Sequence, residues 1–124
     1  MAYVLVVEDE ADHRHILSDV LRWAGHEVRT VPDVEAARVA LHRQRPDLVI
    51  LDLHMTEGES AFVLLAELAP RPDAPRIPVI ACSGDQDNFD RAQRDDRFAA
   101  VFPKPFAISA LVGAVNHLTE TAVL

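Results

Sequence analysis

The most informative run in the chain is Asp47-Leu48-Val49-Ile50-Leu51-Asp52-Leu53-His54-Met55. Branched aliphatic residues fill consecutive positions of this run, whereas a strand with one face in water would alternate apolar with polar residues. The run therefore predicts a central strand of a parallel sheet, buried on both faces. Ligand sites of such sheets lie beyond the carboxyl ends of the strands, so we expect Asp52 to lie where chemistry takes place.

Further strands and helices alternate along the rest of the chain. Apolar runs predict strands at 3–7, 27–31, 77–82 and 98–102. Apolar residues three and four apart predict helices at 11–25, 34–44, 59–69, 86–96 and 107–119, of which 86–96 is expected to be short and mobile. Gly25 is expected to end the first helix, and Asp33 is a candidate N-cap of the second. The expected buried stripe of the first helix is Ile16, Leu17, Val20, Leu21 and Ala24.

This alternation predicts an α/β domain whose parallel sheet is covered by helices on both faces. At 124 residues, the chain is long enough for one core, and we expect a single domain over residues 1–124. No apolar run reaches the roughly 20 residues that span a bilayer, and no leader pattern is seen, so we expect a cytoplasmic protein.

Charge and cysteine content narrow the partners further. The formal net charge is -8 and there is no cluster of Lys or Arg, which argues against direct binding of nucleic acid or anionic membranes. An acidic protein instead suits metal ions or basic partners. The one cysteine, Cys82, lies in an apolar run and has no intramolecular disulfide partner, which fits a reducing compartment.

Polar residues follow the predicted strands at the points where chemistry is expected. They are Glu8 and Asp9 after the first strand, Asp52 after the third, Ser83 after the fourth and Lys104 after the fifth. Three carboxylates held close together repel one another, and a hard divalent cation such as Mg²⁺ relieves the repulsion. Such an ion beside an ammonium and a hydroxyl is suited to handling a phosphoryl group, with a carboxylate as a possible nucleophile.

The order Glu-Asp, Asp, Ser and Lys-Pro-Phe on five strand-helix units resembles the receiver domain of two-component response regulators, and the likeness covers the whole chain. The resemblance implies a flavodoxin-like, doubly wound (βα)5 fold with a five-stranded parallel sheet in the order 2-1-3-4-5. It implies a signalling phosphoacceptor that catalyses its own phosphotransfer and autodephosphorylation, not an enzyme with a separate substrate. We expect a stand-alone receiver, or one taken from a larger protein, with no output domain in these residues.

The resemblance also assigns roles to the polar residues. Asp52 would accept a phosphoryl group from a phosphohistidine on a sensor histidine kinase or a histidine phosphotransfer protein, and this would change which downstream protein binds. Ser83 and Lys104 would bond the phosphoryl oxygens, and the Lys104–Pro105 peptide would be cis. The Mg²⁺ ligands implied are Glu8, Asp9, Asp52 and the backbone carbonyl of His54.

Two further positions in this family set how long the phosphoryl group survives, and they hold His54 and Asp85. An imidazole at the first of these gives the hypothesis of a pH-dependent lifetime. The remaining histidines have no ligand spacing and are expected to be surface residues without a role. They are His13, His15, His26, His42 and His117.

Several positions depart from the family pattern. The aromatic residue that usually rotates on activation lies three places before the lysine, where this chain has Val101. Phe102 is adjacent, but it should point to the opposite face of the strand, which argues against the usual aromatic rotation. Pro103 lacks a backbone donor, so the last strand should be an edge strand. The loop after Asp52 is expected to have a different shape because of Thr56, Gly58 and Ser60.

The last predicted helix and its tail, residues 107–124, contain no Lys or Arg. This argues against the ion-paired dimer that winged-helix transcription factors form through that face. Its small apolar residues are expected to make core contacts, with packing against a partner helix as the alternative. They are Ala110, Val112, Gly113 and Ala114.

Two other functions compete with the phosphoacceptor. A receiver-like docking module that works without phosphorylation is favoured by Val101 and by the altered loop after Asp52. A flavodoxin-like FMN binder shares the strand order. The first loop is Glu8-Asp9-Glu10, however, and this acidic loop would repel a flavin phosphate.

Overall fold

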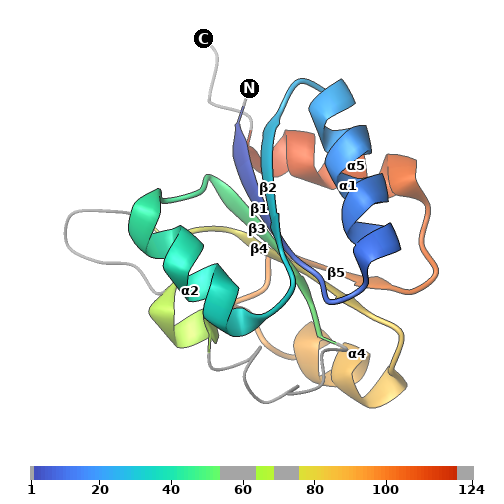
Figure 1. Cartoon of the computed structure of the whole chain (residues 1–124). Coiled ribbons are helices and arrows are strands. Elements are labelled where there is room, and N and C mark those ends of the chain that lie inside the picture. Colours follow the sequence, from blue (N-terminus) through green and yellow to red (C-terminus); the bar gives the residue numbers. More distant parts are fainter. Residues whose placement is uncertain (1, 54–63, 69–75, 120–124) are drawn as a thin grey trace, which may run out of the picture.

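The computed structural model describes residues 2–53, 64–68 and 76–119. Within them a five-stranded sheet carries helices on both faces (Figure 1). The strands are β1 (Tyr3–Val7), β2 (Glu27–Val31), β3 (Leu48–Asp52), β4 (Val79–Ser83) and β5 (Ala100–Pro103). The helices are α1 (Ala11–Trp23), α2 (Val34–Arg43), α4 (Gln86–Gln93) and α5 (Ile108–Thr119), and residues 64–67 are also helical.

All strand pairs of the sheet are parallel, and the order is β2-β1-β3-β4-β5. This confirms the predicted α/β fold with strand order 2-1-3-4-5. Every residue of β1, β3 and β4 is buried, as their continuous apolar runs predicted. The strand β5 lies at the edge, which explains how it accommodates Pro103.

Side chains alternate between two cores, one on each face of the sheet. The helices α1 and α5 cover one face of the sheet (Figure 1). On this face, Val6 of β1 and Ile50 of β3 pack with Leu17 of α1. On the other face, Leu5 and neighbouring strand residues pack with α2, with residues 64–68 and with α4. Burial of each such aliphatic side chain contributes roughly 1.5–3 kcal/mol before entropy is counted. The sheet is therefore a firm platform for the residues at its carboxyl edge.

The predicted stripe on α1 is too wide. Leu17 and Leu21 are buried as expected, but Ile16 is 49% exposed and Ala24 is also exposed. The five residues of the predicted stripe span a wider part of the helix circumference than the part that contacts the sheet. The residues at the outer edges of the stripe therefore face solvent. Gly25 ends the helix as predicted, with φ of +98°, a conformation that glycine adopts without steric cost. Trp23, in the last turn, is 95% exposed.

Other element boundaries shift slightly from the predictions. Asp33 caps α2 as expected, since its Oδ1 accepts a hydrogen bond from the Ala36 amide at 2.7 Å. The strand predicted at 77–82 is found at Val79–Ser83, and the strand predicted at 98–102 begins at Ala100. The helix predicted at 86–96 ends earlier, at Gln93. Residues 64–67 are helical as predicted, and the rest of the helix predicted at 59–69 lies outside the described residues.

The small residues of α5 divide between two environments. Val112 and Ala114 pack against the core on the α1 side of the sheet, as expected, whereas Ala110 and Gly113 are exposed. The core-contact interpretation was therefore wrong for the latter two. Among residues 2–53, 64–68 and 76–119, no helix combines the length and apolar character needed to cross a bilayer.

Candidate functional site

The carboxyl edge of the sheet brings four of the predicted residues together. Parallel pairing sets Asp52 opposite Cys82, and Ser83 opposite Pro103, so the ends of β3, β4 and β5 lie side by side. Glu8 follows β1 directly and its amide donates to the Val31 carbonyl of β2 at 3.0 Å. The chain thereby collects charged and hydroxyl side chains from four neighbouring strands, although the residues are far apart in sequence.

These side chains differ from ordinary surface residues because they are buried. Glu8 and Asp52 are each 3% exposed and Ser83 is 2% exposed, while Lys104 is half-buried. Charged groups leave water at a cost unless they are paired. The burial of these charged groups is therefore typical of a functional site and not of solvated loop residues.

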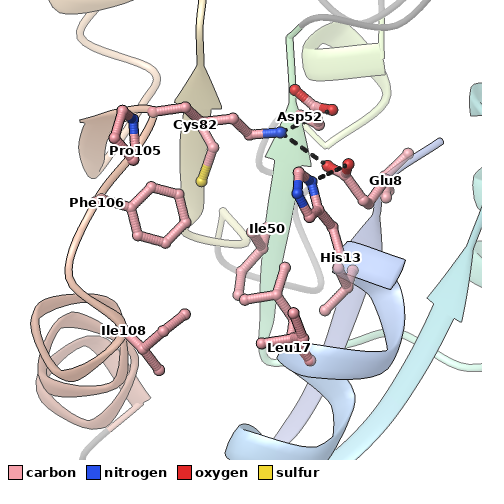
Figure 2. Close-up of a pocket in the computed structure, with 13 residues that line it drawn as sticks. Glu8, His13, Leu17, Ile50, Asp52, Cys82, Pro105, Phe106 and Ile108 are labelled. Atoms are coloured by element: carbon pink, nitrogen blue, oxygen red, sulfur yellow. Dashed lines mark hydrogen bonds and ion pairs between the residues drawn. The ribbon is translucent and has the colours of Figure 1, made fainter. Parts of the chain in front are cut away.

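The Lys104 ammonium joins the two buried carboxylates. Its Nζ lies 3.3 Å from Glu8 Oε2 and 3.3 Å from Asp52 Oδ2 (Figure 2). Burial on its own lowers the pKa of Lys104, but the charges of Asp52 and Glu8 outweigh it and raise the pKa above its ordinary value. Lys104 is therefore positively charged at neutral pH and balances part of the negative charge.

Glu8 carries the clearest electrostatic perturbation in the site. The pKa of Glu8 is raised from 4.5 to about 7, chiefly by burial and then by the hydrogen bond and negative charge of Asp52, against the lowering effects of Lys104 and His13. In the absence of a metal ion, a proton on Glu8 and the positive charge of Lys104 thus both reduce the repulsion between the two carboxylates. The same repulsion between the carboxylates favours binding of a divalent cation in place of that proton.

Among the residues that the structure describes, two groups of side chains have ligand atoms close enough to hold a metal ion. In the first, carboxylate oxygens of Glu8, Asp9 and Asp52 all lie within 4.8 Å of one another. Three oxygen ligands of this kind fit Mg²⁺, which prefers carboxylates and water. The second group joins Glu8 to Glu10 and His13, but both of these added residues are partly or fully exposed.

The hydroxyl of Ser83 is engaged with the turn that follows β4. Ser83 Oγ donates to the Asp85 carbonyl at 2.9 Å and accepts from the Asp85 amide at 3.1 Å. The Asp85 carboxylate in turn accepts from the Asp87 amide at 2.9 Å and caps α4. Asn88 adds a longer contact, 3.4 Å, to the Leu53 carbonyl next to Asp52. Ser83 is therefore linked directly to the start of α4.

The end of β5 positions the lysine. The Lys104 amide donates to the Ser83 carbonyl at 2.8 Å, and the peptide between Lys104 and Pro105 is cis. Val101 packs on the α4 side of the sheet, while Phe102 packs on the α5 side with its ring centroid 5.7 Å from that of Phe106. This confirms that the two neighbours point to opposite faces, so Phe102 does not take the place of Val101.

Two residues near the site went unrecognised in the sequence. His13 was expected to have no role, but its Nδ1 lies 3.2 Å from Glu8 Oε1 and 3.4 Å from Glu10 Oε2. Arg14 donates from one nitrogen to the carbonyls of Glu8 at 2.9 Å and Asp9 at 3.0 Å, which holds the acidic loop against α1. The spacing of Glu10 and His13, three places apart at a helix start, was the available signal.

Some predictions fall on residues outside the described ranges. These are the metal-binding carbonyl and the lifetime role of His54, and the loop shape expected from Thr56, Gly58 and Ser60.

Comparisons with known proteins agree with this architecture. A sequence model described as "Response regulator receiver domain" matches residues 4–116. The transcriptional regulatory protein PdtaR of Mycobacterium tuberculosis is 36% identical over 114 residues, covering 91% of this chain and 54% of PdtaR. The protein-glutamate methylesterase/protein-glutamine glutaminase 1 of Anaeromyxobacter dehalogenans is 38% identical over 81 residues, covering 65% of this chain and 22% of that protein. The chain thus spans about half, or less, of these two relatives.

A solved structure has the same fold as this chain. The response regulator receiver protein from Burkholderia phymatum superposes with a TM-score of 0.80 at 25% identity. The superposition covers 99% of this chain and 98% of that one, so it includes the acidic edge of the sheet as well as both helical layers.

Proposed function

Because the chain belongs to the response regulator receiver family of two-component systems, we propose that Asp52 accepts a phosphoryl group from a phosphohistidine in a Mg²⁺-dependent reaction. The donor would be a sensor histidine kinase or a histidine phosphotransfer protein, acting in the cytoplasm. The observation that carries the proposal is the contact of Lys104 with both Glu8 and Asp52, since it sets a cation beside a buried carboxylate.

The proposed reaction exchanges one bond for another at phosphorus. A carboxylate oxygen of Asp52 attacks the phosphorus atom and forms an O–P bond while the P–N bond of phosphohistidine breaks. The electron pair of the broken bond leaves with the imidazole nitrogen, which takes a proton from solvent. Lys104 lies 3.3 Å from Asp52 Oδ2, so its ammonium is available to the phosphoryl oxygens after a small movement.

The carboxylates of Glu8, Asp9 and Asp52 would hold the Mg²⁺ ion, and their all-oxygen donor set supports this choice of metal. When bound, the ion would neutralise charge on the transferring group. The backbone carbonyl of His54 stays a predicted ligand. Arg14 would keep the loop carrying Glu8 and Asp9 in place through its two carbonyl contacts.

Ser83 would donate a hydrogen bond to the phosphoryl group, as the resemblance predicts. Its hydroxyl hydrogen is engaged by the Asp85 carbonyl, so that bond must open first. Because Asp85 caps α4, opening the bond would alter the N-terminal end of that helix. We propose that phosphorylation changes partner binding through α4, β5 and α5 in this way. A lifetime-setting role for His54 and Asp85 belongs to the same proposal.

A phosphorylation-independent docking module is the second candidate, and Val101 favours it. This residue occupies the position of the usual rotating aromatic and packs against the core on the α4 side of the sheet. A receiver fold without that rotation would present the same surface in both states. The two candidates differ in whether α4 responds when the site is filled.

Intact-mass spectrometry after incubation with acetyl phosphate, with and without Mg²⁺, tests the proposal. We expect one phosphoryl group on the wild type with Mg²⁺ and none on Asp52→Asn. The matched control is Asp19→Asn, because Asp19 is an exposed aspartate of α1 and its variant should be phosphorylated like the wild type. Equal labelling of Asp52→Asn and Asp19→Asn would contradict Asp52 as the acceptor.

The stable phosphoryl analogue beryllofluoride separates the two candidates. Binding that shifts amide resonances in α4 supports the switch, whereas binding without a response in α4 supports the docking module. A chain that takes neither the phosphoryl group nor beryllofluoride, with or without Mg²⁺, would overturn the phosphoacceptor proposal.

A further inference from the structure

A cavity of about 390 Å³ begins at the acidic site and extends between α1 and the start of α5. Its floor is formed by strand residues that include Ile50 of β3 and Cys82 of β4, and its walls are formed by Leu17 of α1 and by Phe106 and Ile108 (Figure 2). The phosphoacceptor chemistry uses none of these five side chains. The cavity is therefore a feature of this site that the proposed function leaves unexplained.

The lining of the cavity has an apolar part and a charged end. Apolar side chains and the neutral Cys82 thiol, whose pKa burial raises to about 12, make up the deep part. Glu8, Asp52 and Lys104 converge at one end, together with His13. Ligand sites in proteins typically measure 300–1,000 Å³ and combine an apolar lining with a few convergent polar groups. The cavity meets both conditions.

The charge at the polar end selects the ligand. Two carboxylates, Glu8 and Asp52, face one ammonium, Lys104, and the carboxylate of Asp9 lies within 4.8 Å of the first two. Asp52 and Asp9 outnumber the one ammonium of Lys104 even when Glu8 carries a proton, so negative charge is in excess at this end. An anionic head group would contact Lys104 but would be repelled by the carboxylates around it, and a neutral head group would gain no such attraction. A cationic head group is attracted by the excess charge.

We propose that the cavity binds small hydrophobic ammonium ions, with the ammonium at Glu8 and Asp52 and the hydrocarbon chain between α1 and α5. Binding itself does not depend on the proposed function. One consequence does: an ammonium at these carboxylates excludes Mg²⁺ and so blocks phosphorylation of Asp52. The site would make the receiver responsive to amines as well as to a kinase.

Titration of the ¹⁵N-labelled chain in metal-free buffer tests the proposal by nuclear magnetic resonance. The probes are n-hexylammonium, n-hexanol and hexanoate, which share a hydrocarbon chain and differ in head-group charge. We expect saturable shifts of the Ile50, Cys82 and Phe106 amides, and an affinity for n-hexylammonium at least about tenfold above that for the other two. Equal affinity for hexanoate, or no saturable shift, would overturn the proposal.

A cavity-filling variant locates the hydrocarbon chain. Ile108→Trp adds bulk at the wall of the cavity, and Val39→Trp adds the same bulk at a 52% exposed position of α2 on the other face of the sheet. We expect n-hexylammonium to bind about tenfold more weakly to Ile108→Trp and unchanged to Val39→Trp. Wild-type affinity in a folded Ile108→Trp would place the ligand elsewhere and contradict the proposal.

The head group is tested by Glu8→Gln and by Mg²⁺. Glu8→Gln removes one of the two carboxylates at the head group, so it should reduce the preference for n-hexylammonium over n-hexanol while the protein stays folded by circular dichroism. Added Mg²⁺ should weaken n-hexylammonium binding in the wild type, and undiminished binding in Mg²⁺-saturated protein would contradict the assignment to Glu8 and Asp52. A chain that binds n-hexylammonium but not Mg²⁺ would support the cavity assignment and count against the proposed function.

Discussion

Ser83 and Asp85 hold each other through two hydrogen bonds of opposite direction, from the hydroxyl to the Asp85 carbonyl at 2.9 Å and from the Asp85 amide to the hydroxyl at 3.1 Å. The same aspartate caps α4 through the Asp87 amide. A group that draws the Ser83 hydroxyl away therefore acts on the helix cap two residues later. This short route needs no aromatic residue at position 101.

The first prediction concerns that cap. Asp85→Ala removes the acceptor of the Asp87 amide, and loss of an N-cap costs about 1 kcal/mol. We expect the free energy of unfolding in urea to fall by that amount and the amides of the first turn of α4 to exchange with solvent faster. Asp85→Asn keeps a side-chain oxygen acceptor and serves as the control. Indistinguishable exchange in the two variants would show that the side chain does not cap the helix.

The second prediction concerns pH. The folded-state pKa of Glu8, about 7, lies above the 4.5 of an ordinary glutamate, so the folded chain binds more protons than the unfolded chain between these values. Its contribution to stability is fully present below about pH 4.5 and is lost as the pH rises through about 7. The loss is at most about 3–4 kcal/mol for a shift of this size. Urea denaturation in metal-free buffer at several pH values measures it.

Glu8→Gln provides the control for this titration, since an amide does not ionise in the range. The variant should lose the fall in stability between mildly acid and mildly alkaline pH. Glu10→Gln changes an exposed glutamate two residues away and should keep the fall. A slope that survives in Glu8→Gln would assign the titration to another group.

The third prediction concerns the metal ion. A ligand that binds only the folded chain stabilises it by about 1.4 kcal/mol at tenfold excess over its Kd, so Mg²⁺ should raise the Tm relative to EDTA. The gain should shrink in Asp9→Asn, which removes one predicted ligand. Asp12→Asn, at an exposed position of α1, should keep the whole gain. Equal gains in both variants would exclude Asp9 as a ligand.

The fourth prediction uses two glycines as a matched pair. Gly25 has φ of +98°, so Gly25→Ala should cost about 1 kcal/mol through backbone strain, although no atom lies within 4 Å of the added methyl group. Gly113 lies inside α5 with the same free space, so Gly113→Ala should stabilise the chain by roughly 0.5–1 kcal/mol. Changes of the same sign in both variants would contradict the conformational explanation.

The sequence was sufficient to predict the strands of the sheet and the polar residues at its carboxyl edge. A continuous apolar run such as that ending at Asp52 is compatible with few environments, and strand ends fix where the next polar residue must lie. The approach of Lys104 to Glu8 follows from the strand order 2-1-3-4-5, which the resemblance to receiver domains implied and the structure confirms. These predictions depend on the backbone alone, and the backbone of a parallel sheet is strongly constrained.

Features that depend on the rotation and packing of helices were not predictable in the same way. The exposure of Ile16 and the contact of His13 with Glu8 both depend on how α1 is turned against the sheet. The cavity beside Phe106 depends on the distance between two helices that are far apart in the chain. The engagement of the Ser83 hydroxyl by Asp85 depends on one side-chain rotamer. No periodicity in the sequence specifies these quantities.

Trp23 has a practical consequence for anyone who follows this protein by spectroscopy. It is the one tryptophan of the sequence and its side chain is 95% exposed, so its indole ring is already surrounded by water in the native fold. Unfolding changes that surrounding very little, and the emission wavelength should hardly move. The fluorescence of Trp23 therefore reports little about folding. An optical reporter of folding would have to be introduced at a buried position of the sheet.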